Sequence, residues 1–568
     1  MAINHSKVYP APVAYFSMEV GIISEMPTYS GGLGVLAGDT LRAAADMGVP
    51  LIGVTLLHRK GYFRQHLDQA GNQTEEPFDW DPAQFLEPLD TIVSVQIEGR
   101  EVKIRPWRLI ITGVTGSQVT VYFLDTCLPE NSEWDRALTD YLYGGDAHYR
   151  LCQEIILGMG GISVLRALGY SRLQAYHMNE GHSALLILSL LEEQMKTHNV
   201  CSVDMTCAQD VRDMCVFTTH TPVPAAVDQF PLDMVARVLG QEHFNALKSA
   251  SCFKDDTLNM TYLGLCFSRY INGVSMRHEE ISQSMFPTYP INSITNGVHP
   301  VSWVSTPFAD LFDREVPEWR KDSNYLRYLI TISIEEVQKA HAAAKRILLG
   351  EIEKRTGLKF DPAVFTIGFA RRATGYKRAN LIFSDLERLR HIVKNVGPIQ
   401  MVYGGKAHPR DESGKEMIRS IFRAAEQLKD SVKIVYLEEY NMELGKLICS
   451  GVDLWLNTPQ KPQEASGTSG MKAALNGVPS LSVLDGWWVE GHVEGVTGWS
   501  IGDSWEPESN IQKELAYLYN KLEYVIIPMY YSRPNTYAWI MRNAIALNGS
   551  YYNSQRMVYQ YTKNAYYP

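Results

Sequence analysis

The sequence predicts an α/β protein with at least one parallel β-sheet covered by helices on both faces. The clearest evidence lies in the second half, where short apolar runs rich in β-branched residues alternate with helix-like segments. The predicted strands are 364–370, 399–404, 432–437, 452–457 and 480–484. The predicted helices between them are 379–393, 415–429 and 442–449. This alternation is typical of a parallel sheet, in which ligands bind at the carboxyl ends of the strands.

The first half alternates less regularly but contains the same kinds of element. The apolar runs predict strands at 13–17, 51–57, 102–111, 119–124, 216–219 and 291–295. A glycine-rich turn at 31–34 precedes a helix over 41–47, and longer apolar patterns predict buried helices at 151–168 and 182–195. Residues 300–319 are interpreted as a linker region, and the tail 511–567 as helical and rich in aromatic residues. We therefore expect two domains, 1–300 and 301–568, with the boundary near Val301.

Length and charge restrict the class of protein. A chain of 568 residues is long enough for two or more domains and a large core. Its net charge of −10 argues against a nucleic-acid-binding protein, which is usually basic. No apolar run reaches the length needed to cross a membrane, and residues 1–12 lack the apolar core of a signal peptide. We expect a cytoplasmic protein that binds neither membranes nor nucleic acid.

The cysteines and histidines do not form a metal-binding pattern. The eight cysteines are scattered and include no Cys-x-x-Cys pair, so we expect them to be reduced. His148, His177 and His182 are close in sequence but do not match a zinc motif. The sequence therefore predicts no metal site.

The most informative stretch is 464–477, Glu-Ala-Ser-Gly-Thr-Ser-Gly-Met-Lys-Ala-Ala-Leu-Asn-Gly. Ser466 and Thr468 are good N-cap residues, and Gly467 permits close approach of a ligand to the backbone. A helix N-terminus attracts anions through its free N–H groups and its dipole. Lys472 lies one turn into this helix and would pair with an anion or form a Schiff base. An ordinary capped helix with a surface lysine is the alternative.

Other clusters follow predicted strands. Arg371, Arg372, Lys377 and Arg378 follow the strand 364–370, and four cations there suit a multiply charged anion, although a solvated basic face is the alternative. The turn at 31–34 lacks the lysine of a P-loop and is, by itself, a weak phosphate-binding signal.

Histidine and asparagine also occur at predicted strand ends. His220 follows the strand 216–219 and is a candidate catalytic residue, although structural histidines are commoner. Glu180 and His182 begin a helix, where capping alone is the alternative, and Asn296 belongs to a plain turn signal.

Taken together and in this order, these pieces resemble the α-glucan phosphorylases, the glycogen, starch and maltodextrin phosphorylase family. The resemblance extends from Ala14-Tyr15-Phe16-Ser17-Met18-Glu19 to the tail and is most specific over 464–477. It is closest to the short bacterial and archaeal branch. It implies a GT-B fold, with two Rossmann-like domains facing each other across an active-site cleft and the C-terminal tail packing back on the N-terminal domain. It also implies the cofactor pyridoxal 5′-phosphate, bound to the lysine that matches Lys472.

The same resemblance assigns roles to individual residues. The cofactor would be held by the positions that match Lys472, Arg371, Lys377, Thr468, Gly32, Tyr440 and Trp303. The catalytic set would be Lys472, Arg372, Lys377 and His220, with Arg372 and Lys377 on the substrate phosphate. The substrate-binding set would be Leu33, Asp146, Glu180, His182, His220, Asn296, Tyr376, Glu464, Ser466 and Gly467. Asp146 matches the mobile gating loop of the active site, and Arg371 stands where the animal branch has lysine.

The implied reaction is reversible phosphorolysis of α-glucans. Phosphate attacks the terminal α-1,4 bond and gives α-glucose 1-phosphate with retention. Two phosphate groups at short range cannot both be fully ionised, so a proton shared between cofactor and substrate is available near neutral pH. The implied partners are an α-glucan and inorganic phosphate, and the resemblance is compatible with a homo-oligomer.

The sequence departs from the family pattern at two places, and two other functions are alternatives. Ala226-Val227 stands where relatives often have Gly-His, and the stretch 373–375 also differs, which affects the expected acceptor preference more than the reaction type. Segments that serve nucleotide and phosphoserine control in animal enzymes are missing, so we expect no such regulation. The alternatives are a GT-B transferase that uses a nucleotide sugar, which would not need Lys472, and an inactive glucan-binding protein.

Overall fold

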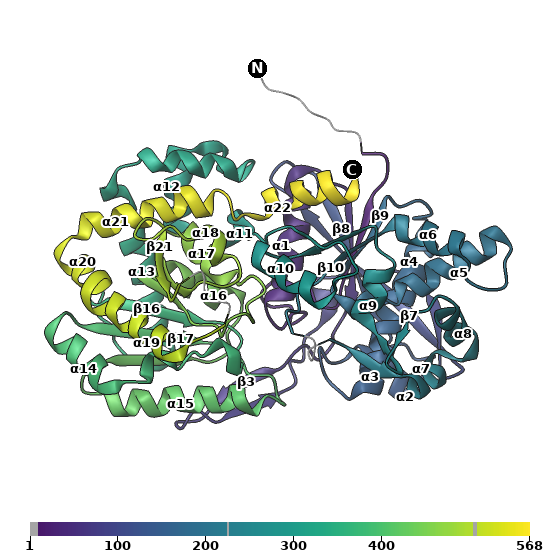
Figure 1. Ribbon diagram of the computed structural model, residues 1–568, viewed down its shortest axis with the longest axis horizontal. Helices are drawn as coiled ribbons and strands as arrows, with labels where there is room; N and C mark the ends of the chain where they lie inside the picture. Colours follow the sequence, from purple (N-terminus) through teal and green to yellow (C-terminus); the bar gives the residue numbers. More distant parts are fainter. Residues whose placement is uncertain (1–8, 224–226, 504–507) are drawn as a thin grey trace, which may run out of the picture.

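The computed structural model describes residues 9–223, 227–503 and 508–568, and it confirms an α/β protein with parallel sheets. The chain forms two large sheets that lie side by side, one built from residues before 294 and the other from residues after 364 (Figure 1). We call the first sheet with its helices the N-terminal half, and the second sheet with its helices the C-terminal half. No helix in the described ranges is long and apolar enough to cross a membrane.

The sheet of the N-terminal half has ten strands, and most of its neighbouring strands are parallel. Along the sheet its strands are β15 (Asn292–Ser293), β14 (Tyr270–Gly273), β10 (Cys215–Thr218), β9 (Ala175–Asn179), β1 (Val13–Ser17), β2 (Leu51–Leu56), β8 (Gln118–Asp125), β7 (Arg100–Thr112) and β5 (Glu87–Pro88), with β6 (Val93–Ile97) also paired to β7. The predicted pair 102–111 and 119–124 is confirmed as the antiparallel ladder β7–β8. Every residue of β1 and β2 is buried, as expected for strands covered on both faces.

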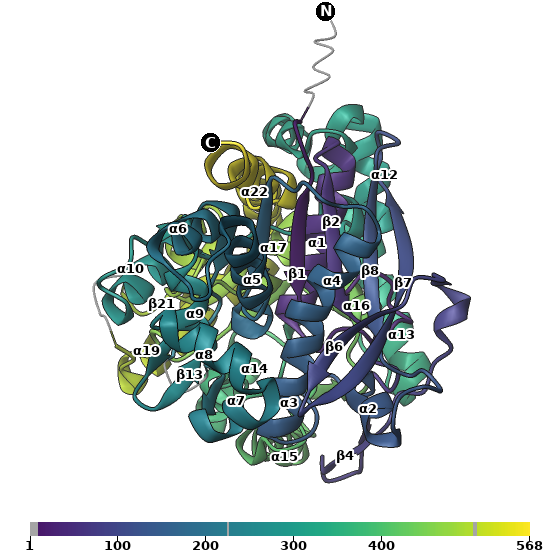
Figure 2. The same ribbon diagram turned by 90° about the vertical axis from the view of Figure 1, so that its right-hand side faces the viewer.

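Helices cover both faces of this sheet. One face packs against a continuous helical stretch of α3 (Ala147–Ile155), a π-helical turn (Ile156–Gly160) and α4 (Gly161–Ala167), together with α5 (Leu186–His198). The other face packs against α1 (Gly32–Met47). Figure 2 shows β1, β2, β8 and β7 running past α4 and α1. The smaller helices of this half are α6 (Met205–Met214), α7 (Leu232–Leu239), α8 (Gln241–Ser249), α9 (Met260–Cys266) and α10 (Met276–Met285).

The sheet of the C-terminal half has six strands, all parallel. Their order is β18 (Lys433–Leu437), β17 (Ile399–Gly404), β16 (Phe365–Ala370), β19 (Leu454–Asn457), β20 (Ser480–Val483) and β21 (Gly498–Ile501). The five predicted strands are confirmed within two residues, and β21 was not predicted. The helices are α13 (Ile334–Thr356), α14 (Leu386–Asn395), α15 (Glu412–Leu428), α16 (Met442–Gly451), α17 (Ser469–Leu475), α18 (Trp488–Gly491), α19 (Ile511–Asn520), α20 (Ile527–Ser532) and α21 (Pro534–Asn543).

The last helix of the chain returns to the N-terminal half. α22 (Ser554–Tyr561) crosses from the C-terminal half and lies beside α1 (Figure 1). Met557, Val558 and Tyr561 are buried in the same hydrophobic cluster as Leu41 of α1. The hydroxyl of Tyr566 lies 2.7 Å from Nδ1 of His177 on β9. The tail is therefore helical, as predicted.

Three sequence-based boundaries were wrong. Residues 32–34 form the first turn of α1 rather than a separate turn, because α1 begins nine residues earlier than predicted. Residues 300–319 are largely helical, as α11 (Pro300–Trp303), α12 (Thr306–Glu315) and a short 3-10 turn (Pro317–Arg320). α14 begins only at Leu386, because the Asp385 carboxylate accepts a hydrogen bond from the N–H of Arg388 and starts the helix there.

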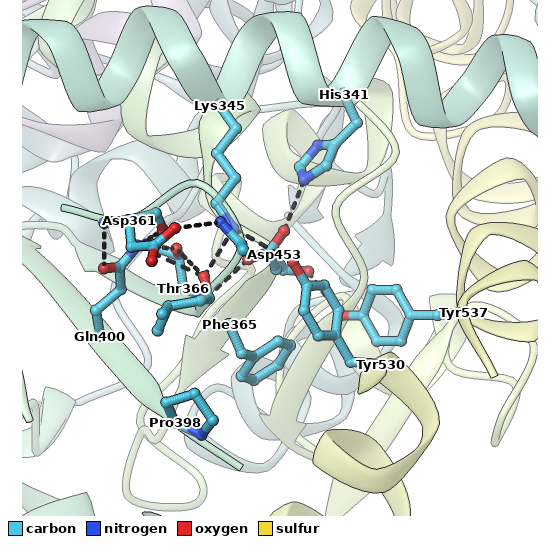
Figure 3. A network of polar contacts seen from close by, with 12 residues as sticks. His341, Lys345, Asp361, Phe365, Thr366, Pro398, Gln400, Asp453, Tyr530 and Tyr537 are labelled. Carbon is cyan, nitrogen blue, oxygen red and sulfur yellow. Dashed lines mark hydrogen bonds and ion pairs between the residues drawn. The ribbon is translucent and has the colours of Figure 1, made fainter. Parts of the chain in front are cut away.

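A buried polar network fastens α13 to the six-stranded sheet at the end where β16 begins (Figure 3). Asp453 accepts hydrogen bonds from Lys345 Nζ (2.6 Å) and from the N–H of Thr366 (2.7 Å), and its other oxygen lies 2.9 Å from His341 Nε2. Burial by itself would raise the pKa of Asp453, but Lys345 and His341 outweigh burial and hold that pKa below its ordinary value. The carboxylate is therefore charged and paired within the core.

Candidate active site

A cavity of about 530 Å³ lies between the carboxyl ends of the two parallel sheets. Lining residues of the N-terminal half that follow β1, β9 and β10 include Glu19, Glu180 and His220. Lining residues of the C-terminal half that follow β16, β17, β18 and β19 include Arg371, Lys406, Tyr440 and Glu464. Polar residues at the carboxyl ends of the strands of both halves therefore line one cavity.

Cations outnumber carboxylates around this cavity, although the whole chain is acidic. Its lining contains the cations Arg150, Arg371, Arg372, Lys377, Lys406, Arg410 and Lys472, and the carboxylates Glu19, Glu180, Asp228 and Glu464. Such a concentration of positive charge in a concave, partly desolvated space favours an anionic ligand.

Glu464 is the centre of an ion-pair cluster on one wall. Its carboxylate accepts hydrogen bonds from Lys377 Nζ at 2.7 and 2.8 Å and pairs with the Arg371 guanidinium at 2.9 Å. Burial would raise the pKa of Glu464, but Arg371 and Lys377 outweigh burial and hold that pKa below its usual value. Arg372, which directly follows Arg371 in the sequence, makes no ion pair with any carboxylate in the described ranges. Its guanidinium is therefore the cation of this cluster that is free to bind an anion.

Lys472 lies inside the cavity wall, in the helix that the sequence predicted. α17 covers Ser469–Leu475, and Gly477, with a φ of +70°, ends it as expected. The Lys472 ammonium lies 3.6 Å from the centroid of the Trp303 ring. Burial lowers the pKa of Lys472, and nearby Asp39 only partly opposes this effect. A buried lysine with a lowered pKa provides the free amine that carbonyl chemistry requires.

The predicted N-caps of α17 were wrong in detail. Thr468 occupies the N-cap position but its side chain caps no N–H, and Ser466 Oγ is buried with no partner among the described residues. Gly467 has a φ of +85°, where a side chain would be strained. These groups line the cavity, so their polar atoms are available to a ligand rather than used for capping.

The N-terminus of α1 faces the cavity from the opposite half. Gly31, Gly32 and Leu33 line it, and a Cβ atom added to either glycine would meet no atom within 4 Å. The first turn of α1 carries no acidic residue. The N–H of Gly31 already donates to Glu19 Oε2 at 3.3 Å, so the N–H groups left to approach an anion or a sugar are those of Gly32 and Leu33.

His220 is neutral and fixed by residues of β9 and the turn after it. Its Nε2 lies 2.6 Å from Asn179 Oδ1, and its main-chain N–H donates to Glu180 Oε2 at 2.7 Å. Burial lowers the pKa of His220 to about 3, and neighbouring histidines act in the same direction. Glu180 has a φ of +75°, a strained conformation that directs its carboxylate toward His220.

All but one of the predicted site residues line this cavity. The lining includes Lys472, Arg371, Arg372, Lys377, His220, Thr468, Gly32, Tyr440, Trp303, Leu33, Glu180, His182, Asn296, Tyr376, Glu464, Ser466 and Gly467. Asp146 is not in the lining, because its carboxylate caps α3 by accepting the N–H of Tyr149 at 2.9 Å. Of the two departures noted in the sequence, Ala226 lies outside the described residues, Val227 lines the cavity, and Ala373 is buried.

Several lining residues were not predicted. Glu19 accepts hydrogen bonds from the N–H of Ser30 and from the Tyr143 hydroxyl, and Asp228 pairs with His182 at 3.3 Å. Glu19 directly follows a buried strand, which is the signal that would have found it. Asp228 follows no predicted strand, so no comparable signal marked it.

A second cavity, of about 330 Å³, adjoins the first. The two cavities share Tyr62, Tyr143, His408 and Arg410 as lining residues. The second is rich in aromatic rings, and Tyr62 and Phe63 lie with their centroids 4.4 Å apart. Aromatic faces beside polar groups are suited to binding sugar rings. Among the described residues, no group of three or more His, Cys, Asp or Glu side chains is arranged to hold a metal ion.

Comparisons with known proteins agree with this arrangement. The family described as carbohydrate phosphorylase matches residues 241–495. The chain is 39% identical to the maltodextrin phosphorylase of Thermococcus litoralis, over 99% of this chain and 71% of that protein. It is 34% identical to the glycogen phosphorylase of Aquifex aeolicus, over 99% of this chain and 87% of that protein. An uncharacterized protein of Methanocaldococcus jannaschii is 31% identical over 98% of this chain and 99% of its own length.

Proposed function

Because the chain belongs to the carbohydrate phosphorylase family, we propose that it catalyses the reversible phosphorolysis of terminal α-1,4 bonds in α-glucans. The products are α-glucose 1-phosphate and a glucan shorter by one unit, with retention at the anomeric carbon. We propose a GT-B arrangement with domains 1–300 and 301–568, in which the cleft between the domains is the active site. The two parallel sheets, with the cavity between their carboxyl ends, support this arrangement.

The observation that carries the proposal is the position of Lys472 beside a set of cations. The lysine is buried, its ammonium forms no ion pair with any described carboxylate, and it lines the same cavity as Arg371, Arg372 and Lys377. A nucleotide-sugar transferase would have no need of a buried lysine at this place.

The residues present fit pyridoxal 5′-phosphate as the cofactor. Lys472 offers an amine whose pKa is lowered by burial, and Trp303 and Tyr440 provide aromatic walls. Arg371 Nε and Ser466 Oγ are buried polar atoms with no partner among the described residues, so a ligand that hydrogen bonds to them would remove a desolvation cost. We propose that Lys472, Arg371, Lys377, Thr468, Gly32, Tyr440 and Trp303 hold the cofactor.

When bound, the cofactor would supply a phosphate group able to exchange a proton with the substrate phosphate. The protein itself holds and neutralises the two anions. Arg372, which has no carboxylate partner in the described ranges, binds the substrate phosphate, and Lys377 turns to it from Glu464. The N-terminus of α1 adds positive potential from the other side of the cleft. These groups offset the charge that accumulates as the glycosidic bond breaks.

The remaining lining residues recognise the terminal glucose. Asn296 Oδ1 is buried and has no partner among the described residues, so it is available to a sugar hydroxyl. The same cavity is also lined by Glu464, Ser466, Gly467, Leu33 and Tyr376. Glu180 holds His220 in place by accepting a hydrogen bond from its main-chain N–H. The neutral His220 side chain provides a polar contact without adding charge. Asp146 would act only through the position of its loop, since its carboxylate caps α3.

The test is glucose 1-phosphate formation from maltodextrins of defined length and phosphate. The cofactor-loaded protein is compared with its Lys472→Ala variant and with Lys394→Ala, which changes a lysine on α14 outside the cavity lining. Product from the wild type and the Lys394→Ala variant, with none from Lys472→Ala, supports phosphorolysis. Transfer from a nucleotide sugar without phosphate, or full activity of Lys472→Ala, would refute the proposal.

A further inference from the structure

A β-hairpin of the N-terminal half reaches across to the C-terminal half. It consists of β3 (Arg64–Leu67) and β4 (Gln73–Glu76), and in Figure 1 β3 lies between the two halves, near the end of α15. At its turn Gly71 packs against α15 so closely that a Cβ atom would lie 2.5 Å from the ring of Phe422. Glu75 forms an ion pair with Lys415 of α15 at 2.9 Å. The hairpin is therefore a contact between the two halves.

Two buried glutamines of this hairpin bind the main chain of the loop that follows β17. The Gln73 amide donates to the Ala407 carbonyl at 2.9 Å and accepts the Ala407 N–H at 3.0 Å. The Gln65 amide nitrogen donates to the Gly405 carbonyl at 3.0 Å and to Gln73 Oε1 at 2.9 Å. Gln65 Oε1 accepts the N–H of Glu439 at 3.1 Å. The two side chains therefore pair with backbone as a neighbouring strand would, independently of the side chains of the loop.

The other edge of the same loop is hydrogen bonded to residues 371–373, which follow β16. The N–H of Arg371 donates to the Gly404 carbonyl at 3.0 Å, and the N–H of Ala373 donates to the Lys406 carbonyl at 2.9 Å. Residues 404–407 therefore lie between the hairpin and the segment that contains Arg372. The next residue of the loop, His408, lines both cavities.

The walls of the second cavity come from both halves. Glu75 and Glu76 belong to the hairpin, whereas His408, Pro409 and Arg410 belong to the loop. Its shape therefore depends on the hydrogen bonds that join hairpin and loop. If a glutamine side chain is removed, the buried main-chain groups of the loop lose their hydrogen-bond partners. Because unsatisfied buried groups are costly, this loss favours separation of the hairpin from the loop.

We propose that Gln65 and Gln73 are positioning residues that fix the second cavity and thereby determine how well the protein binds glucans long enough to reach it. The part of this inference that concerns glucans rests on the proposed function. The first cavity is lined mainly by other segments, so the glutamines affect chain-length preference more than use of phosphate.

The experiment compares Gln65→Met and Gln73→Met with Gln69→Met. All three remove an amide from the same hairpin, but Gln69 is exposed at its turn. KM is measured for short and long maltodextrins and for phosphate. We expect the two buried variants to raise KM for long maltodextrins about fivefold or more, the loss that corresponds to one hydrogen bond, with KM for phosphate nearly unchanged. Gln69→Met should behave as the wild type.

Equal changes of KM for short and long maltodextrins, or no change, would overturn the inference. Hydrogen exchange on the wild-type protein tests the contact without mutation or activity. The Ala407 amide should exchange at least tenfold more slowly than the exposed amides of the hairpin turn. Exchange as fast as in that turn would also overturn it. If the wild type produces no glucose 1-phosphate, the proposed function fails, whereas slow exchange at Ala407 would still support the contact.

Discussion

The ammonium of Lys472 faces the ring of Trp303, 3.6 Å from the ring centroid, and the edge of that ring is fixed from the other half of the molecule. The indole N–H of Trp303 donates to the carboxylate of Asp39, in the middle of α1, at 2.9 Å. Asp39 also accepts the main-chain N–H of His299. The negative charge of the same carboxylate acts to raise the pKa of Lys472 and so opposes the effect of burial. α1 therefore controls both the orientation of the ring and the charge state of the lysine.

Replacing Asp39 with asparagine should make Lys472 a stronger nucleophile at low pH. The amide oxygen still accepts the Trp303 N–H, but the negative charge is lost, so the pKa of Lys472 falls further. The unprotonated amine is then present at lower pH. The rate at which protein freed of pyridoxal 5′-phosphate takes it up again should therefore reach its half-maximum at lower pH than in the wild type.

Asp310→Asn provides the matched control for this charge change. Asp310 is exposed on α12, so its loss should leave the pH profile of uptake unchanged. A shift of the Asp39→Asn profile to higher pH would contradict the proposed electrostatic role of Asp39.

Replacing Arg372 with glutamine should impair phosphate binding more than glucan binding. Its guanidinium pairs with no carboxylate in the described ranges, so it is available to the substrate phosphate. Charge-assisted hydrogen bonds contribute about 1.5 to 3 kcal/mol, which corresponds to a rise of about 10-fold to 150-fold in KM for phosphate. Arg419→Gln, which removes an arginine paired with Glu416 on α15, should leave KM unchanged. Equal losses for phosphate and maltodextrin in Arg372→Gln would show a general structural role instead.

Replacing Lys345 with methionine should destabilise the protein without changing its specific activity. The variant leaves the buried Asp453 carboxylate without its closest cation (Figure 3), at a cost of about 3 kcal/mol in the free energy of unfolding. Lys339→Met, an exposed change on the same helix, should cost less than about 0.5 kcal/mol in urea unfolding. Adding Asp453→Asn to Lys345→Met should restore part of the loss. If the double variant is less stable than Lys345→Met, the explanation by an unpaired charge is wrong.

The parts of the fold that the sequence predicted are those encoded locally. The five strands β16 to β20 are short apolar runs with polar residues at their ends, and each was predicted within two residues. The start of α1 was missed because Gly31, Gly32 and Gly34 are poor helix formers. Within α1, Gly34 and Gly38 pack closely against Glu19 and Gly21, a tertiary contact that no local pattern shows.

The candidate site was predictable for a different reason. Residues at strand ends and in the stretch 464–477 could be identified, and nearly all of them line one cavity. Asp146 does not, because a local N-cap contact determines where its carboxylate points. Gln65 and Gln73 carried no sequence signal, because their partners are main-chain groups more than 300 positions away.

Buried neutral histidines predict how stability depends on pH. Burial lowers the pKa of His177 to about 3, and its ring nitrogens lie 2.7 Å from the Tyr566 hydroxyl and 2.8 Å from Thr218 Oγ1. Because the pKa is lower in the folded protein than the unfolded value of about 6.5, the unfolded state binds more protons between these two values. Stability is therefore complete above pH 6.5 and is lost as the pH falls toward 3. This histidine alone should cost about 2 kcal/mol between pH 7 and pH 5.

Urea unfolding of the wild type and of His177→Gln at pH 7 and pH 5 isolates this contribution. The variant is expected to be less stable at pH 7, because its side chain does not replace both hydrogen bonds. However, its free energy of unfolding should fall by about 2 kcal/mol less between the two pH values than that of the wild type. Asp485, whose pKa burial raises to about 7, acts in the opposite direction, but it is common to both proteins and cancels in the difference. Parallel pH dependences of the two proteins would show that His177 is protonated in the folded state as readily as in the unfolded chain.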